Sequence, residues 1–365
     1  ARRLPSPVPS SSRLIRPDPQ LESLRDALRR AEDKAAGHRD RRRPRSGLAP
    51  RADLHVDFFR QYALFTRAFM DFGERLAANH EPASVLEVDT PTSVGGGVAA
   101  ALMRWPDTVG RYALPNPSAS ATMHALDGEL RAASTLDRVD PTHGGFALAC
   151  ASFDASQPSA ATSTAAGGAE RLRQWMALLK PEGVLAVVEH IPGPEHAPVH
   201  VPVLRRALMD LRESGEPLTI LAPCAHQLAC PLDAGADARG EARGLPTQCR
   251  FAQRLEWRRD MRPGRGQRGN AFEPLHFAYL VVAGSGVRPA PAQPTAGRVL
   301  SPPRKRSGHV LMDVCDGEGA LRDIVVSRRH GASLDGTSPY REARKSSWGD
   351  FWGGFHGGAG SEAGV

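Results

Sequence analysis

The chain lacks the features that mark membrane-spanning and disulfide-rich proteins. Its 365 residues contain no run of about 18 apolar residues, the length that a transmembrane helix requires. Its five cysteines are too few for a disulfide framework, and their odd number fits a reduced compartment with four metal ligands and one further thiol. We therefore expect no membrane partner, and a length of this size allows two domains.

Lysine is nearly absent, since it occurs only at positions 34, 180, 305 and 345 among 47 basic residues. A compositional bias of this kind makes any single arginine a weak indication of function. The net charge of +7 and the pI of about 9.5 nevertheless favour an anionic partner such as nucleic acid.

Acidic residues are missing from the N-terminus until Asp18, in a segment rich in arginine and serine. This composition is typical of an organelle transit peptide. It is also typical of a basic arm that lies on RNA, and the two interpretations are compatible. We expect residues 1–54 to form a basic extended arm with one helix.

Strand-like and helix-like segments alternate from residue 55 to residue 218, which predicts a mostly parallel sheet covered by helices on both faces. The predicted strands lie at 83–88, 110–115, 145–153 and 181–190. The predicted helices lie at 55–78, 95–105, 120–133, 169–180 and 201–214. Aromatic residues recur at helical spacing in the first helix and are expected to face the core, as is Cys150 in the third strand.

Residues 219–352 are expected to form a β-rich extension that completes the sheet and carries a metal site. Strand-like runs lie at 219–226 and 276–284, and a terminal β pair is predicted at 308–315 and 322–329. We interpret the Pro- and Gly-rich segment 285–307 as a long loop, segment 340–354 as a basic tail with aromatic residues, and residues 353–365 as a flexible tail.

A strand that ends in Glu87 is followed by a loop that reaches Gly95 and Gly96 and then by a helix. This order is typical of nucleotide-like cofactor sites, in which glycines let the backbone approach the ligand. S-Adenosylmethionine methyltransferases carry an acid-x-Gly-x-Gly-x-Gly loop at this point. Here Asp89 and Pro91 stand where the first two glycines belong, so we expect a degenerate cofactor loop and little or no S-adenosylmethionine binding.

Four cysteines have the spacing of a metal site: Cys224, Cys230, Cys249 and Cys315. Thiolates are soft ligands, and four of them at one point commonly hold an iron–sulfur cluster or a zinc ion. His226 lies between the first two and would complete a zinc site if Cys315 were distant. We prefer the set of four cysteines, with His226 as a neighbour of the ligands or a surface group. The spacing does not decide between zinc and a cluster.

Basic residues flank the cysteines, and arginine and lysine bind phosphate oxygens without reading sequence. Trp348 and Phe351 are candidates for stacking on bases. The candidate RNA-binding residues are Arg250, Arg254, Arg304, Lys305, Arg306, Arg328, Arg329, Arg341, Arg344 and Lys345.

Several motifs give the chain a specific resemblance: APCAHQLACPL, QCRFAQR, HFAYLVV, KRSGHVLMDVC and YREARKSSWGD. Together they resemble the mitochondrial small-ribosomal-subunit methyltransferase-like family (methyltransferase-like protein 17 and its fungal and protist relatives). The resemblance runs from about residue 55 to about residue 352 and is strongest over 219–352.

The resemblance implies a Rossmann-like methyltransferase fold and a mitochondrial matrix protein that binds small-subunit rRNA as an assembly factor or ribosomal component. It also implies that the four cysteines hold a [4Fe–4S] cluster. Because the cofactor loop is degenerate, we expect neither catalysis nor a small-molecule substrate. The alternatives are an active S-adenosylmethionine-dependent rRNA methyltransferase and a zinc-containing RNA-binding module.

Overall fold

The structure is a computed structural model. It describes residues 54–75, 81–88, 90–115, 126–128, 130–131, 136–157, 162, 164–233, 248–256, 272–285, 287, 297–329 and 338–353. Apart from their innermost positions, the arm predicted for 1–54 and the tail predicted for 353–365 lie outside these residues. Most of the helix predicted at 120–133 lies outside them as well.

The described residues fall into two compact units. The α/β unit takes its described residues from 15–223 and 253–290. The β unit takes its described residues from 224–252 and 291–365. The segment that carries the first three cysteines therefore belongs to the same unit as Cys315.

The α/β unit is built on an eight-stranded sheet in which the order β3-β2-β1-β4-β5-β8-β6 is joined by β7 beside β8. The strands are β1 (Ser84–Glu87), β2 (Arg111–Ala113), β3 (Asp137–Arg138), β4 (Phe146–Asp154), β5 (Leu179–Ile191), β6 (Thr219–Ala222), β7 (Phe251–Glu256) and β8 (Phe272–Ala283). The first five strands pair in parallel, whereas β8 is antiparallel to both β5 and β6. The prediction of a mostly parallel α/β sheet is confirmed.

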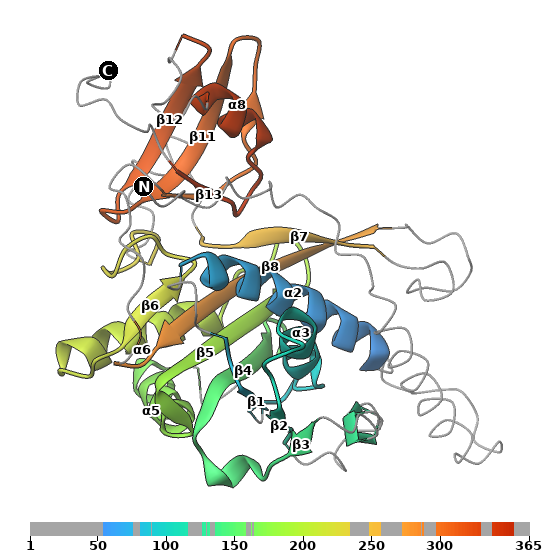
Figure 1. Ribbon diagram of the computed structural model, residues 1–365. Helices are drawn as coiled ribbons and strands as arrows, with labels where there is room; N and C mark the ends of the chain where they lie inside the picture. Colours follow the sequence, from blue (N-terminus) through green and yellow to red (C-terminus); the bar gives the residue numbers. More distant parts are fainter. Residues whose placement is uncertain are drawn as a thin grey trace, which may run out of the picture. The chain divides into compact units, whose positions relative to one another are not determined.

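Among the residues that the structure describes, two pairs of helices cover this sheet. In one pair, α2 (Leu54–Arg75) packs on α3 (Gly96–Arg104) and crosses β5 and β8 (Figure 1). In the other, α5 (Ala165–Ala177) packs on α6 (His200–Glu213) and both contact β5. Right-handed crossovers on either side of the strand-order reversal at β1 and β4 place the pairs on opposite faces.

Apolar patterning explains why these elements form. Eight of the nine residues of β4 are buried, as expected for a strand covered on both faces. The aromatic stripe of α2 is buried, as predicted; its residues are Phe58, Phe59, Tyr62, Phe65 and Phe69. Cys150 on β4 is fully buried, which confirms it as a core residue.

The β unit is an antiparallel sheet with one short helix. Its elements are β9 (Gly297–Val299), β10 (Arg304–Lys305), β11 (His309–Asp316), β12 (Leu321–Ser327), α8 (Pro339–Lys345) and β13 (Phe351–Trp352). The central strand β11 pairs with β12 on one side and with β9 and β10 on the other, and β13 pairs with β9.

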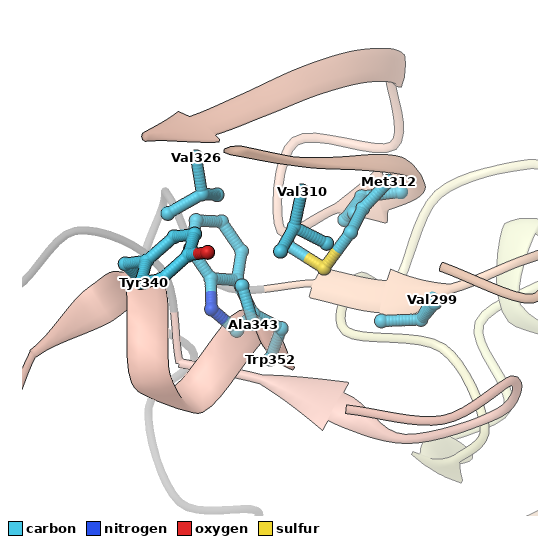
Figure 2. Packing of buried hydrophobic residues seen from close by; sticks show 8 residues of the cluster. Val299, Val310, Met312, Val326, Tyr340, Ala343 and Trp352 are labelled. Carbon is cyan, nitrogen blue, oxygen red and sulfur yellow. The ribbon is translucent and has the colours of Figure 1, made fainter. Parts of the chain in front are cut away.

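Side chains that alternate along β11 separate two faces of this sheet. Val310, Met312 and Val314 pack with Tyr340 of α8 and with Trp352 in one apolar cluster (Figure 2). Cys315 has the opposite orientation, because neighbouring residues of a strand point to opposite faces. The β unit therefore has an apolar core on one face and the cysteine on the other.

Two predictions for this region are wrong. The predicted loop 285–307 contains β9 and β10, and β9 lies between β11 and β13. The predicted basic tail 340–354 contains most of α8 and all of β13, and Trp352 within it is only 2% exposed. In the part of the chain that the structure describes, no helix is both long and apolar enough to cross a membrane.

Candidate functional site

The Glu87 carboxylate caps the N-terminus of α3. Its oxygens accept hydrogen bonds from the backbone N–H groups of Gly95 at 2.7 Å, Gly97 at 3.1 Å and Val98 at 3.3 Å. The N-cap residue Gly95 supplies no side chain for this purpose. Burial raises the pKa of Glu87 to about 7, although the backbone hydrogen bonds act in the opposite direction.

The glycines after β1 are close-packed against the protein's own chain. A Cβ on Gly96 would lie 2.6 Å from Gln61 Cβ and 2.9 Å from the Tyr62 backbone N of α2. A Cβ on Gly97 would lie 2.9 Å from the Cys150 Sγ of β4. Gly95 has φ of 87°, which only glycine adopts readily. These glycines thus allow α2 and β4 to approach α3.

Hydroxyl side chains occupy the carboxyl ends of β1 and β4, where the strand order reverses and where open α/β sheets commonly bind ligands. The Oγ1 atoms of Thr90 and Thr92 each donate to the Ser152 carbonyl at 2.7 Å. Ser93 Oγ donates to the Val88 carbonyl at 2.7 Å, and Gln61 Nε2 donates to the Thr92 carbonyl. Asp89 lies outside the described residues.

Glu189, two residues before the end of β5, has the same role as Glu87. Its carboxylate accepts from the backbone N–H groups of Val199 at 2.6 Å, His200 at 3.0 Å and Val201 at 2.9 Å, at the start of α6. The N-cap residue Val199 makes no side-chain capping bond. Burial raises the pKa of Glu189, although these hydrogen bonds act to lower it.

The β unit brings cysteines together. Cys230 and Cys315 lie in one buried cluster with Leu232 and Leu300, and Cys249 packs against it. Cys224 is also buried, six positions before Cys230 in the same segment. All five cysteines of the chain are thiols. Cys230 and Cys315, which are 85 positions apart in the sequence, thus meet in one unit.

His226 contacts Cys315 through a defined ring nitrogen. Its Nε2 lies 3.4 Å from the Cys315 Sγ, and its Nδ1 accepts the Leu228 backbone N–H at 3.2 Å. Because Nδ1 is an acceptor, the neutral ring carries its proton on Nε2 and donates it to the sulfur. His226 is 3% exposed and is a hydrogen-bond donor to a predicted metal ligand. This contact agrees with the prediction that His226 is a neighbour of the cysteines and not one of the four ligands.

The described side chains do not surround a common point in the way that metal ligands do. Within the described ranges, no three Cys, His, Asp or Glu side chains are grouped as a metal ion would require. The donor set itself fits a soft metal centre, since four thiols and a buried N–H donor lie in one unit. Metal binding by the four cysteines therefore stays a prediction.

A buried arginine, which sequence analysis missed, lies beside the cysteines. Arg298 on β9 is 2% exposed and pairs in register with Cys315 on β11. Its Nη1 donates to the Gly349 carbonyl at 2.8 Å, and its guanidinium lies 5.6 Å from the Phe351 ring centroid. No nearby motif distinguished this arginine from the 47 basic residues of the chain.

The predicted RNA-binding residues have unequal surroundings. Arg250 lies over the Trp348 ring at 6.0 Å, so one predicted stacking ring is already in contact with the chain, as Phe351 is with Arg298. Arg254 belongs to the α/β unit and lies 5.3 Å from the Phe272 ring centroid. The exposed members in the β unit are Arg304, Lys305, Arg306, Arg328, Arg329, Arg341, Arg344 and Lys345.

Solved structures similar to this chain include methyltransferases. A SAM-dependent methyltransferase of Leishmania major is 13% identical, with 72% of this chain and 85% of that chain covered and a TM-score of 0.30. An O-methyltransferase family protein of Burkholderia thailandensis is 14% identical, with 47% and 57% covered and a TM-score of 0.30.

Two curated fungal relatives are similar over shorter stretches. The Schizosaccharomyces pombe protein "Rsm22-cox11 tandem protein 2, mitochondrial" is 29% identical over 157 residues, 36% of this chain and 19% of the relative. The Saccharomyces cerevisiae "Ribosome assembly protein RSM22, mitochondrial" is 27% identical over 224 residues, 48% of this chain and 35% of the relative. The chain thus spans about a third or less of the relatives it matches.

A match to one protein family covers most of the chain. Residues 54–353 match the family described as "Mitochondrial small ribosomal subunit Rsm22". The family and both relatives are mitochondrial by name, which confirms the predicted localisation. The resemblance seen in the cysteine and aromatic motifs is also confirmed. The chain belongs to the mitochondrial small ribosomal subunit Rsm22 family.

Proposed function

We propose that this chain binds the rRNA of the mitochondrial small ribosomal subunit and acts in its assembly or as one of its components. Family membership supports the ribosomal part of this proposal, as does the name of the yeast relative, a ribosome assembly protein. The positive net charge and the exposed basic residues of the β unit support rRNA as the partner.

In this proposal the α/β unit transfers no methyl group. The observation that carries this part is the packing of Gly96 against Gln61 and Tyr62 of α2, because a cofactor loop needs its glycine backbone open to the ligand. The acid of the loop, Glu87, is already bonded to the N–H groups of α3. The sheet is then a scaffold that positions surfaces for rRNA and ribosomal proteins.

We further propose that Cys224, Cys230, Cys249 and Cys315 hold a [4Fe–4S] cluster with a structural role. Three of these cysteines already pack together. Arg298 and the His226 N–H group would offset part of the negative charge of four thiolates. When bound, the cluster supplies cross-links between segment 224–249 and β11, which contribute folding free energy to the β unit.

Crosslinking in intact mitochondria tests the ribosomal proposal. For this experiment the chain is expressed with an affinity tag and captured after ultraviolet irradiation, and the RNA crosslinked to it is sequenced. We expect small-subunit rRNA to be enriched at a few discrete positions. Enrichment of other mitochondrial RNAs to the same degree would overturn the proposal. Titration calorimetry with S-adenosylmethionine tests the non-catalytic part: we expect no binding heat, and micromolar binding would restore the methyltransferase alternative.

A further inference from the structure

The exposed basic residues of the β unit differ in whether a carboxylate of the same chain offsets their charge. Arg304 Nη2 lies 3.3 Å from Asp313 Oδ1 and 3.6 Å from Asp323 Oδ1. Arg322 bonds to Asp316 and lies 3.0 Å from Glu318 Oε2. These two arginines have local partners, so an external anion gains less from binding them.

Arg328 and Arg344 are arranged differently, because both lie on one aromatic ring. Their guanidinium carbons lie 5.6 Å and 5.8 Å from the centroid of the Tyr340 ring. Arg344 Nη1 also donates to Tyr340 Oη at 3.3 Å. Both arginines are exposed, and among described residues neither has a carboxylate within ion-pair distance. Two positive charges are therefore held together without an anion from this part of the chain.

The ring beneath these arginines is rigidly placed. Tyr340 is 6% exposed and packs in the apolar cluster with Val326 and Ala343 (Figure 2). The backbone of Arg328 is fixed as well, since its N–H group donates to the Gly308 carbonyl at 2.9 Å. A pre-positioned guanidinium loses little conformational freedom when it binds, which favours a specific contact over a diffuse one.

We propose that Arg328 and Arg344, mounted on Tyr340, form a phosphate clamp that holds the RNA backbone. The planar fork of a guanidinium matches the non-bridging oxygens of a phosphodiester, and stacking on the ring fixes the direction of the fork. The clamp deepens the proposed rRNA binding and rests on it. An RNA is favoured over an acidic protein because the chain carries a net charge of +7 and belongs to a ribosomal family.

The clamp is tested with the full chain and fluorescent RNA oligonucleotides of several sequences. Dissociation constants are measured at a series of KCl concentrations. Arg328→Ala and Arg344→Ala should each lower the magnitude of the slope of log K against log salt by about 0.7 to 0.9, because each removes one phosphate contact. Their affinity should fall by a similar factor for every sequence. Arg322→Ala, a matched exposed control, should keep the wild-type slope.

The possible outcomes separate the clamp from the wider proposal. If wild-type protein binds RNA and both clamp variants keep its slope, the clamp is overturned while rRNA binding stands. If wild-type protein binds no RNA, the clamp and the proposed rRNA binding are both overturned. Equal losses of affinity for RNA and for polyglutamate would overturn the clamp in favour of an acidic-protein site. Circular dichroism and thermal midpoints like those of wild type would exclude misfolding as the cause of the changed slope.

Discussion

Glu87 at the end of β1 and Glu189, two residues before the end of β5, each cap the helix that follows the strand. Both helices lack an acidic residue in the first turn and a side-chain cap of their own. A carboxylate at a helix N-terminus satisfies orphan N–H groups and interacts favourably with the helix dipole. The strand-end glutamates therefore supply the caps that the local sequence of α3 and α6 omits.

Burial of Glu87 makes the stability of the α/β unit depend on pH. Its pKa rises from an ordinary 4.5 to about 7 on folding. The stabilising contribution of the protonated form is thus complete below pH 4.5 and is lost as the pH rises through 7. Between pH 5 and pH 8, Glu87 should lower the free energy of unfolding by up to roughly 3 kcal/mol.

Urea unfolding of wild type and Glu87→Gln at these two pH values measures the effect. The glutamine does not titrate, so its free energy of unfolding should change less with pH than that of wild type. An equal change in the two proteins would show that Glu87 does not titrate in this range.

His226 joins the segment that carries Cys224 and Cys230 to β11, because it accepts from Leu228 and donates to Cys315. His226→Ala removes both bonds and leaves a backbone N–H without its acceptor, which should cost about 1–3 kcal/mol of unfolding free energy. His226→Gln keeps an amide donor and should cost less. Chemical denaturation of the purified chain compares the two, and an alanine variant as stable as wild type would contradict this role.

The close contact between helices α2 and α3 depends on the absence of a side chain at Gly96. Gly96→Ala would place a Cβ against Gln61 and the α2 backbone and should destabilise the α/β unit by about 1–3 kcal/mol through overpacking. Gly110→Ala is the matched control, since nothing lies within 4 Å of its added Cβ. The thermal unfolding midpoints of the Gly96→Ala and Gly110→Ala variants test this expectation. Equal midpoints would contradict the close packing.

Strands that lie in apolar runs could be predicted from the sequence, and strands outside such runs could not. The strands β1, β2, β4 and β5 lie where apolar runs predicted them, because full burial needs continuous hydrophobic residues. The strands β9, β10 and β13 are two or three residues long and lie in Pro-, Gly- and Arg-rich or basic segments, which carry no apolar or periodic signal. Pairing with β11 stabilises them, and that contact is not local in sequence.

The residues of the candidate site could likewise be predicted only in part from the sequence. The four cysteines were identified by residue type, and three of them meet in the β unit. Cys150 was correctly separated from them as a core residue. Arg298 was missed because its neighbour Cys315 lies on another strand. Tyr340 was missed because Arg328, one of the two arginines on its ring, is distant in the sequence.

The chain belongs to a ribosomal family, and its described residues form one unit with an α/β sheet and one that contains the cysteine cluster and exposed basic residues. We propose that the β unit provides both rRNA contact and metal binding and that the α/β sheet carries out no chemistry. We propose that the four cysteines hold an iron–sulfur cluster that stabilises the β unit.

Measurement of iron, zinc and acid-labile sulfide in the full chain, purified without oxygen, tests for this cluster. We expect about four iron and four sulfide per chain, with a brown colour. Cys230→Ser should lose both, and Cys150→Ser should keep them because Cys150 lies in the α/β core. Zinc in place of iron, or iron unaffected by Cys230→Ser, would contradict the account.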